Sequence, residues 1–118
     1  MILQKALGAM FRRVYHKTTG RNLNYVQDLH KQIVREGHWN GKSIVTIDLS
    51  AASDSISMLL VESVLPPWVV ELIQSIRSPL FCLTQDDGTY KTYPARIVST
   101  MGNGFTFELL TLVMSASL

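Results

Sequence analysis

One short run constrains the fold more than any other feature of this chain. Residues 43–47 (SIVTI) are mostly β-branched and apolar, which is typical of a buried strand, and they lead directly into Asp48. Apolar residues recur at helical spacing on both sides of this run: over Ile2 to Tyr15, from about Asn24 to Glu36, and over Ala52 to Leu65. A strand between helices predicts a mixed fold and argues against all-α and all-β classes.

The second half of the chain contains clear breaks. Pro66-Pro67 ends the third helix and begins a fourth, because proline fits the first position of a helix. Residues 80–84 and 89–93 read as two strands joined by an Asp-Gly turn, and residues 105–118 as an apolar helix. The whole order predicts an α+β fold with an antiparallel sheet.

Composition excludes several classes of protein. The single cysteine, Cys82, excludes a disulfide framework and a cysteine-based zinc site. The apolar stretch 105–118 contains Glu108 and is shorter than the roughly 20 residues that span a bilayer. The 118 residues form one small domain or a piece of a larger one, and we expect an intracellular protein that does not bind membranes.

Charge is unevenly distributed. Residues 1–47 hold eight Lys or Arg against two acids, a net of +6, and residues 48–118 hold three against seven, a net of −4. Such asymmetry suits a protein that contacts a polyanion with one part and holds cations with the other. The alternative explanation of this asymmetry is that the charged residues simply lie on helix faces exposed to water.

Two stretches carry groups suited to chemistry. Asp48 ends the predicted strand, where a carboxylate can bind a hard divalent cation, or can instead cap the helix that follows. Residues 99–109 (STMGNGFTFEL) hold two glycines that permit close backbone approach, followed by a helix N-terminus that favours anions. The alternative for this second stretch is an ordinary loop before a helix.

Together these stretches resemble a known family. Residues 45–57 (VTIDLSAASDSIS) are similar to polymerase motif A, and residues 99–110 to motif B, of the replicase catalytic (beta) subunit of leviviruses, the single-stranded RNA bacteriophages. The resemblance covers essentially the whole chain and is weaker before Gly41. Leu110 departs from it, because the family is expected to carry a second acid there, and we assign that position no role.

The resemblance implies a partial right-hand polymerase palm, built as strand–helix–helix–β-hairpin–helix. Residues 1–42 are then a basic helical segment at the junction of fingers and palm, and residues 43–118 part of the palm. The chain ends within a helix before motif C, so we expect a fragment that lacks the second metal-binding carboxylates, the thumb and most of the fingers.

The implied activity is RNA-directed RNA synthesis, in which nucleotides from NTPs are added to an RNA 3′ end by two-metal catalysis. Asp48 is the implied ligand of two Mg²⁺ ions, for which Mn²⁺ is a substitute. Asp54 is the implied neighbour of the incoming ribose, with Ser53 competing for that role, and Asn103 or Thr106 also lies near the sugar. The loop residues expected along the template–nucleotide pair are Met101, Gly102 and Gly104.

The resemblance also implies partners. They are template RNA, NTPs, host translation elongation factors and a ribosomal protein, in the cytoplasm of an infected bacterium. Arg12, Arg13 and Arg21 are the candidates for RNA phosphate contacts, because arginine pairs bidentately with phosphate.

Other interpretations remain at this stage. Asp86-Asp87 could be mistaken for the carboxylate pair of motif C, but it precedes motif B and its Asp-Gly turn explains it. A non-catalytic RNA-binding remnant is one rival, and another palm nucleotidyltransferase, such as a reverse transcriptase, is a second. We expect these 118 residues to be catalytically inactive alone.

Overall fold

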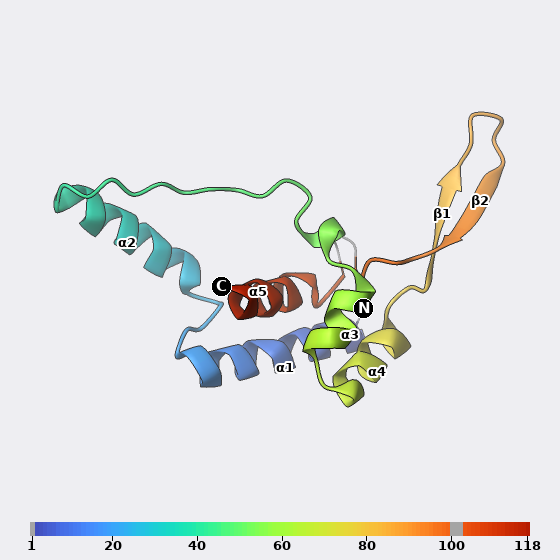
Figure 1. Ribbon diagram of the computed structural model, residues 1–118, viewed down its shortest axis with the longest axis horizontal. Helices are drawn as coiled ribbons and strands as arrows, with labels where there is room; N and C mark the ends of the chain where they lie inside the picture. The colour runs from blue at the N-terminus through green and yellow to red at the C-terminus, as the bar shows by residue number, and fades with distance from the viewer. Residues whose placement is uncertain (1, 100–102) are drawn as a thin grey trace.

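The computed structural model describes residues 2–99 and 103–118, and within them it confirms the α+β class. The elements in chain order are α1 (Ile2–Thr19), α2 (Val26–Trp39), the 3₁₀ turn η1 (Ser53–Ser55), α3 (Met58–Val64), α4 (Pro67–Ile76), β1 (Leu80–Thr84), β2 (Tyr90–Pro94) and α5 (Thr106–Ser117). Figure 1 shows α1, α3, α4 and α5 gathered in the middle, with α2 and the hairpin as arms on opposite sides.

Helix α1 follows the predicted apolar spacing. In α1, Leu7, Phe11 and Tyr15 recur every four residues and are buried, so one stripe of the helix faces the core. The helix ends at Thr19, and Gly20 follows with a φ of +72°, a conformation that glycine adopts at little cost. Pro67 opens α4 as predicted.

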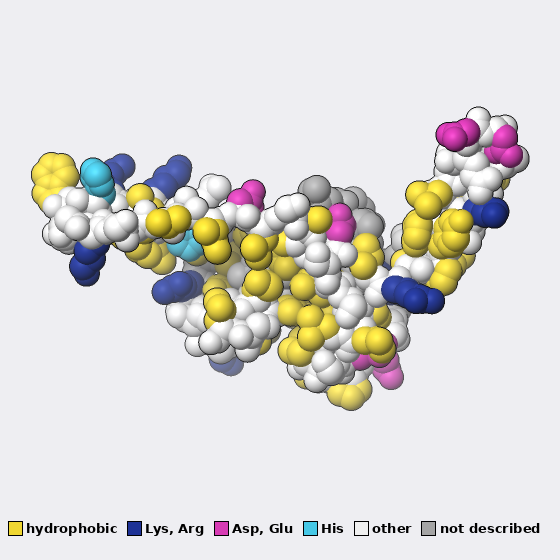
Figure 2. All heavy atoms as spheres, turned by 45° about the horizontal axis from the view of Figure 1, so that its top comes forward, with side chains coloured by type: hydrophobic (Ala, Val, Ile, Leu, Met, Phe, Trp, Pro, Cys, Tyr) yellow, Lys and Arg dark blue, Asp and Glu magenta, His cyan; other side chains and the backbone are white. Residues whose placement is uncertain are grey.

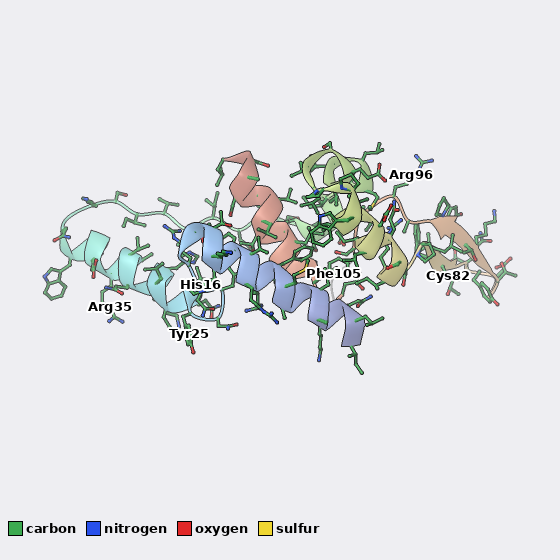
Figure 3. All side chains as sticks on the ribbon, turned by 90° about the horizontal axis from the view of Figure 1, so that it is seen from below. His16, Tyr25, Arg35, Cys82, Arg96 and Phe105 are labelled. Atoms are coloured by element: carbon green, nitrogen blue, oxygen red, sulfur yellow. The ribbon has the colours of Figure 1, made fainter. Side chains whose placement is uncertain are left out.

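The core lies where α1 and α5 pack together with α3 and α4. Phe105 is fully buried at its centre, and Leu109 and Val113 continue the apolar stripe along α5. Figure 3 shows Phe105 among these helices, whereas Tyr25 and Arg35 lie on the α2 arm and Cys82 on the hairpin. Helix α1 therefore shares its core with elements from the far end of the chain.

The buried strand predicted at residues 43–47 is wrong. This segment has no regular structure, Val45 is 79% exposed and Ile47 is 84% exposed. A strand requires a neighbour for its N–H and C=O groups, and the only strands in the described residues, β1 and β2, pair with each other. Residues 43–49 make no backbone–backbone hydrogen bond within the described chain.

The helix predicted from Ala52 to Leu65 is interrupted. Residues 53–55 form η1, Ile56 is extended, and α3 begins only after Ser57, whose Oγ accepts a hydrogen bond from the Leu60 N–H at 3.1 Å. Ser57 is therefore the N-cap, not Ser50 or Ser53. The extended residues at this break pair with residues 96–98.

The hairpin predicted on either side of the Asp-Gly turn is confirmed. Strands β1 and β2 pair antiparallel, with Leu80 opposite Pro94 and Thr84 opposite Tyr90. Gly88 has a φ of +83°, which the tight turn requires. The hairpin projects from the helices, and Figure 2 shows acidic side chains gathered at its tip and basic ones along the arm formed by α2.

The two arms make the molecule long. Its extents are 58 × 37 × 26 Å and its radius of gyration is 17.4 Å, against about 13 Å for a compact chain near this length. Within the described residues, no helix combines the length and apolar character that crossing a membrane requires.

Candidate functional site

A short backbone ladder joins the two stretches that the sequence singled out. The Met58 N–H donates to the Arg96 carbonyl at 2.8 Å, and the Val98 N–H donates to the Ile56 carbonyl at 3.0 Å. Ser57 and Ile97 form an antiparallel bridge between these bonds. The end of the 45–57 stretch is thereby fixed beside the start of the 99–110 stretch.

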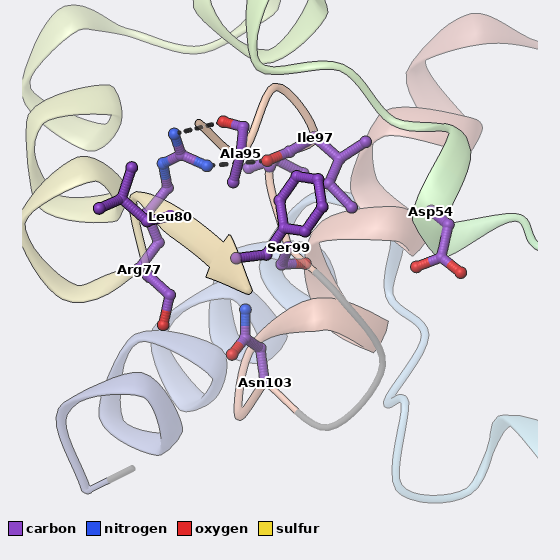
Figure 4. A pocket seen from close by; sticks show the side chains of 10 residues that line it. Asp54, Arg77, Leu80, Ala95, Ile97, Ser99 and Asn103 are labelled. Atoms are coloured by element: carbon purple, nitrogen blue, oxygen red, sulfur yellow. Dashed lines mark hydrogen bonds between the residues drawn. The ribbon is translucent and has the colours of Figure 1, made fainter. Parts of the chain in front are cut away.

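A pocket of about 480 Å³ opens beside this ladder. Its lining combines apolar side chains from the base of the hairpin with polar groups from both stretches: Asp54, Arg77, Ser78, Leu80, Phe81, Ala95, Ile97, Val98, Ser99 and Asn103. Figure 4 shows Arg77 on one side and Asp54 on the other, with Ser99 and Asn103 between them. Two residues predicted from the sequence, Asp54 and Asn103, therefore line one pocket.

Arg77 closes one wall of this pocket. Its two terminal guanidinium nitrogens donate to the Ile97 carbonyl at 2.8 Å and to the Ala95 carbonyl at 2.9 Å. The planar guanidinium thus binds two carbonyls of the chain segment that leads from β2 to the ladder. No local pattern in the sequence indicates this role for Arg77, because its partners are 18 and 20 residues away.

Ser99 lines both the pocket that contains Asp54 and Asn103 and the crevice beside it. It is buried, and its hydroxyl shares a hydrogen bond with the Thr106 hydroxyl at 2.9 Å. Ser53, Ser99 and Thr106 also line a small crevice next to the pocket. Sequence reasoning missed Ser99 as a site residue, although a polar residue directly after the apolar pair Ile97-Val98 was an available signal.

Asp48 stands apart from this cluster. It lies in the exposed, extended segment before η1 and does not line the pocket. Between Asp48 and Asp54 the chain turns at Ala51, whose φ of +52° is left-handed and costs a residue with a side chain about 1 kcal/mol. The Asp48 side chain is exposed to solvent and is not part of the packed interior.

The glycine loop is described only in part. Met101 and Gly102 lie outside the described residues. Gly104 packs so closely on α1 that a Cβ there would lie 2.8 Å from the Lys5 backbone nitrogen. Only glycine fits at that crossing.

Of the three arginines predicted to contact phosphate, Arg12 is engaged within the protein. Its Nε donates to the Glu108 carboxylate at 2.6 Å, and a terminal nitrogen donates to the Asn24 side-chain oxygen. The guanidinium also lies 5.9 Å from the centre of the Phe107 ring. Arg13 and Arg21 are exposed.

The paired acids of the hairpin tip have a structural explanation. Thr89 donates to the Asp87 carboxylate from its hydroxyl at 2.6 Å and from its N–H at 2.9 Å, and these two bonds lower the pKa of Asp87. Among residues 2–99 and 103–118, no three His, Cys, Asp or Glu side chains are grouped to hold a metal ion.

Comparison with known proteins decides the family. The family described as "RNA replicase, beta-chain" matches residues 1–117. The chain belongs to this replicase family. Among its relatives, the RNA-directed RNA polymerase beta chain of Escherichia phage MS2 is 44% identical over 98% of this chain, and that of Enterobacteria phage fr is 42% identical over the same share. The RNA-directed RNA polymerase subunit beta of Escherichia virus Qbeta is 39% identical, again over 98%.

The matched region is a small part of each replicase relative. The chain spans 20% of the MS2 and fr proteins and 18% of the Qbeta protein. The resemblance drawn from the two sequence stretches is therefore confirmed at the level of family, over about a fifth of the length of these relatives.

Proposed function

We propose that this region forms part of the palm of an RNA-directed RNA polymerase, and that residues 43–118 carry its motifs A and B. The observation that carries the proposal is the convergence of Asp54 from one motif with Ser99 and Asn103 from the other on a single pocket. The phage relatives described above, which are RNA-directed RNA polymerases, agree with it. Residues 1–42 then belong to the junction of palm and fingers.

The pocket suits a nucleotide. Leu80, Phe81 and Ile97 offer an apolar wall for a base, and the opposite side offers a carboxylate, a hydroxyl and an amide. Such groups pair with the hydroxyls of a sugar, and the 2′ hydroxyl distinguishes RNA precursors from DNA precursors. We assign Asp54 and Asn103 to the ribose, with Ser53 and Thr106 behind them in the adjoining crevice.

Asp48 is the proposed metal ligand. Its exposed carboxylate is the oxygen donor that Mg²⁺ prefers, and Mg²⁺ sites commonly take one or two carboxylates together with substrate phosphates and water. The donor set therefore fits part of a site for two Mg²⁺ ions, or Mn²⁺ in their place, with further ligands from the remainder of the polymerase. When bound, such ions offset phosphate charge and ease deprotonation of the attacking 3′ hydroxyl.

The remaining partners follow from the same proposal. Template RNA and NTPs are the substrates, and Arg13 and Arg21 are exposed on the basic N-terminal part, where they can pair with RNA phosphates. Arg12 has its partners inside the protein. The proposed protein partners are host elongation factors and a ribosomal protein, and the proposed location is the bacterial cytoplasm. Only membership of the family supports these partners and this location.

Substitution of Asp48 in the complete polymerase tests the proposal. Asp48→Asn keeps the size of the side chain and removes its charge, so elongation should fall by at least about 100-fold while thermal unfolding is unchanged. Asp86→Asn is the matched control, because Asp86 is an exposed acid at the hairpin tip, and it should retain full elongation.

Two results contradict the proposal in different ways. Near-normal elongation by Asp48→Asn means that Asp48 is not a metal ligand. Tight RNA binding without nucleotide incorporation by the unmodified polymerase favours a non-catalytic RNA-binding protein.

A further inference from the structure

We propose that Gln4 and Arg12 of α1 are positioning residues for the nucleotide pocket, a role that rests on the proposed function. They hold the segment 103–108, which carries Asn103 into the pocket and begins α5. Three separate contacts between α1 and this segment support the assignment.

The first contact is a crossing of backbones at two glycines. A Cβ on Gly8 would lie 2.6 Å from the Gly104 carbonyl oxygen, and a Cβ on Gly104 would lie 2.8 Å from the Lys5 backbone nitrogen. Both distances are shorter than van der Waals contact allows, so α1 and the loop approach as closely as glycine permits. Asn103 is the residue next to this crossing.

The second contact is the side-chain amide of Gln4. Its oxygen accepts from the Gly104 N–H at 3.3 Å, and its nitrogen donates to the Ile76 carbonyl at 3.0 Å. One side chain thus joins the loop to the C-terminal end of α4. Arg77, which clamps the opposite wall of the pocket, follows Ile76 directly.

The third contact is the ion pair between Arg12 and Glu108. The Glu108 side chain is only 9% exposed, and its partner across the 2.6 Å contact is Arg12. A carboxylate this buried requires a paired cation, so the start of α5 is held at one position along α1. Gly8 lies one helical turn before Arg12 and Gln4 one turn before Gly8, so the three contacts follow one face of α1.

Together these contacts hold Asn103 from the side opposite the backbone ladder. The ladder fixes residues 96–98, directly before Ser99, to residues 56–58, and α1 fixes Gly104 and Glu108. Ser99 and Asn103 each lie next to one of these two sets of contacts. Loss of the α1 anchor should shift Asn103 without removing any group that contacts the nucleotide.

Direct binding measurements on the full-length polymerase test this. Gln4→Leu removes both amide bonds at nearly constant size, and Arg12→Met removes the ion pair. Each should raise the Kd for an NTP about tenfold and reduce the preference for NTP over dNTP about tenfold, because small misplacements at a site are costly. Arg12→Lys, which can keep the bond to Glu108, should remain within about threefold of the unmodified protein.

Lys17→Met is the matched control. Lys17 is an exposed cation on the same helix, and its loss should leave both the Kd and the sugar preference unchanged. A purely structural role for Gln4 or Arg12 would lower the fraction of folded protein, which changes the number of binding sites and not the Kd or the sugar preference.

The outcomes separate the two proposals. Unchanged Kd and sugar preference in Gln4→Leu overturn the positioning role, whatever the elongation activity. An RNA affinity that falls in Arg12→Met, with a shallower salt dependence and normal NTP binding, also overturns it, since that pattern marks a phosphate contact. A raised NTP Kd in Gln4→Leu supports the positioning role, whether or not the polymerase makes RNA. Failure of the unmodified polymerase to make RNA would count against the proposed function instead.

Discussion

At the scale of single residues, the surroundings of a side chain decide its task. Arg12 and Arg13 are adjacent and chemically identical, yet Arg12 turns to Glu108 and Asn24 whereas Arg13 is exposed. Helical geometry separates neighbouring side chains by about 100° around the axis, so only one of the two faces α5. Asp87 and Asp48 are both exposed acids, but Asp87 accepts two hydrogen bonds from Thr89.

The turn of the hairpin gives a pH prediction at this scale. Hydrogen bonds from the Thr89 hydroxyl and N–H lower the pKa of Asp87 below its ordinary value of 3.8. A carboxyl with a lowered folded-state pKa stabilises the turn above its unfolded pKa, and this contribution is lost as the pH falls through the folded value. The turn should therefore loosen only in strong acid.

An NMR titration of the Asp87 carboxyl checks this. Thr89→Val removes the hydroxyl bond and should raise the titration midpoint of Asp87 toward the ordinary value. Thr92→Val, on the neighbouring strand, is the control and should leave the midpoint unchanged. A Thr89→Val midpoint equal to that of the unmodified chain would mean that the hydroxyl bond does not set the pKa.

Much of the candidate site was implied by the resemblance of residues 45–57 and 99–110 to family motifs. Asp54, Ser53, Asn103 and Thr106 were expected near one nucleotide, and they lie around one pocket and its crevice. The Arg12–Glu108 pair spans 96 residues, and no local pattern in the sequence indicates such a partner. Residue type predicts which chemistry is available, whereas long-range packing decides which arginine is free to use it.

At the scale of elements, local signals predicted local structure. The spacing of Leu7, Phe11 and Tyr15, the proline at the start of α4 and the Asp-Gly turn all act over a few residues, and each prediction is confirmed. The prediction of a strand at residues 43–47 was wrong because a strand forms only when a neighbouring strand pairs with it. The β-branched residues of this segment favour extended backbone, but no strand in the described residues pairs with them.

Hydrogen exchange tests this account of residues 43–49. In the 118-residue chain their amides should exchange at nearly the unprotected rate, because none donates to another backbone group in the described chain. In the complete polymerase the same amides should be protected at least about 100-fold, if this apolar segment joins a sheet there. The Leu109 amide, bonded to the Phe105 carbonyl in the core, is the internal control and should be protected in both. Equal, fast exchange in both proteins would show that the segment is not a strand of the palm.

At the scale of the whole molecule, the proposed polymerase site needs more groups than these described residues bring together. The described residues hold no cluster of three metal-ligating side chains, and the chain spans about a fifth of its relatives. A two-metal reaction needs more carboxylates than Asp48 alone supplies. Under the proposed function, further carboxylates would have to come from outside these residues.

The isolated chain should therefore be inactive. Purified and incubated with Mg²⁺, template RNA and NTPs, it should yield no template-directed product above the background without enzyme. The complete polymerase, assayed in parallel, is the positive control. Labelled product of template-encoded sequence from the 118 residues would show that a full catalytic site lies within them.

The two strands of the hairpin project from the helices, and their bases lie close together (Figure 1). Arg77, just before β1, holds the carbonyls of Ala95 and Ile97, just after β2, so the base of this excursion is closed independently of its tip. The outer turn can therefore change in length and sequence during evolution while Arg77, Ala95 and Ile97 keep their arrangement in the pocket. For the experimenter, the same closure makes residues 86–88 a tolerant point at which to insert a reporter peptide into a working replicase.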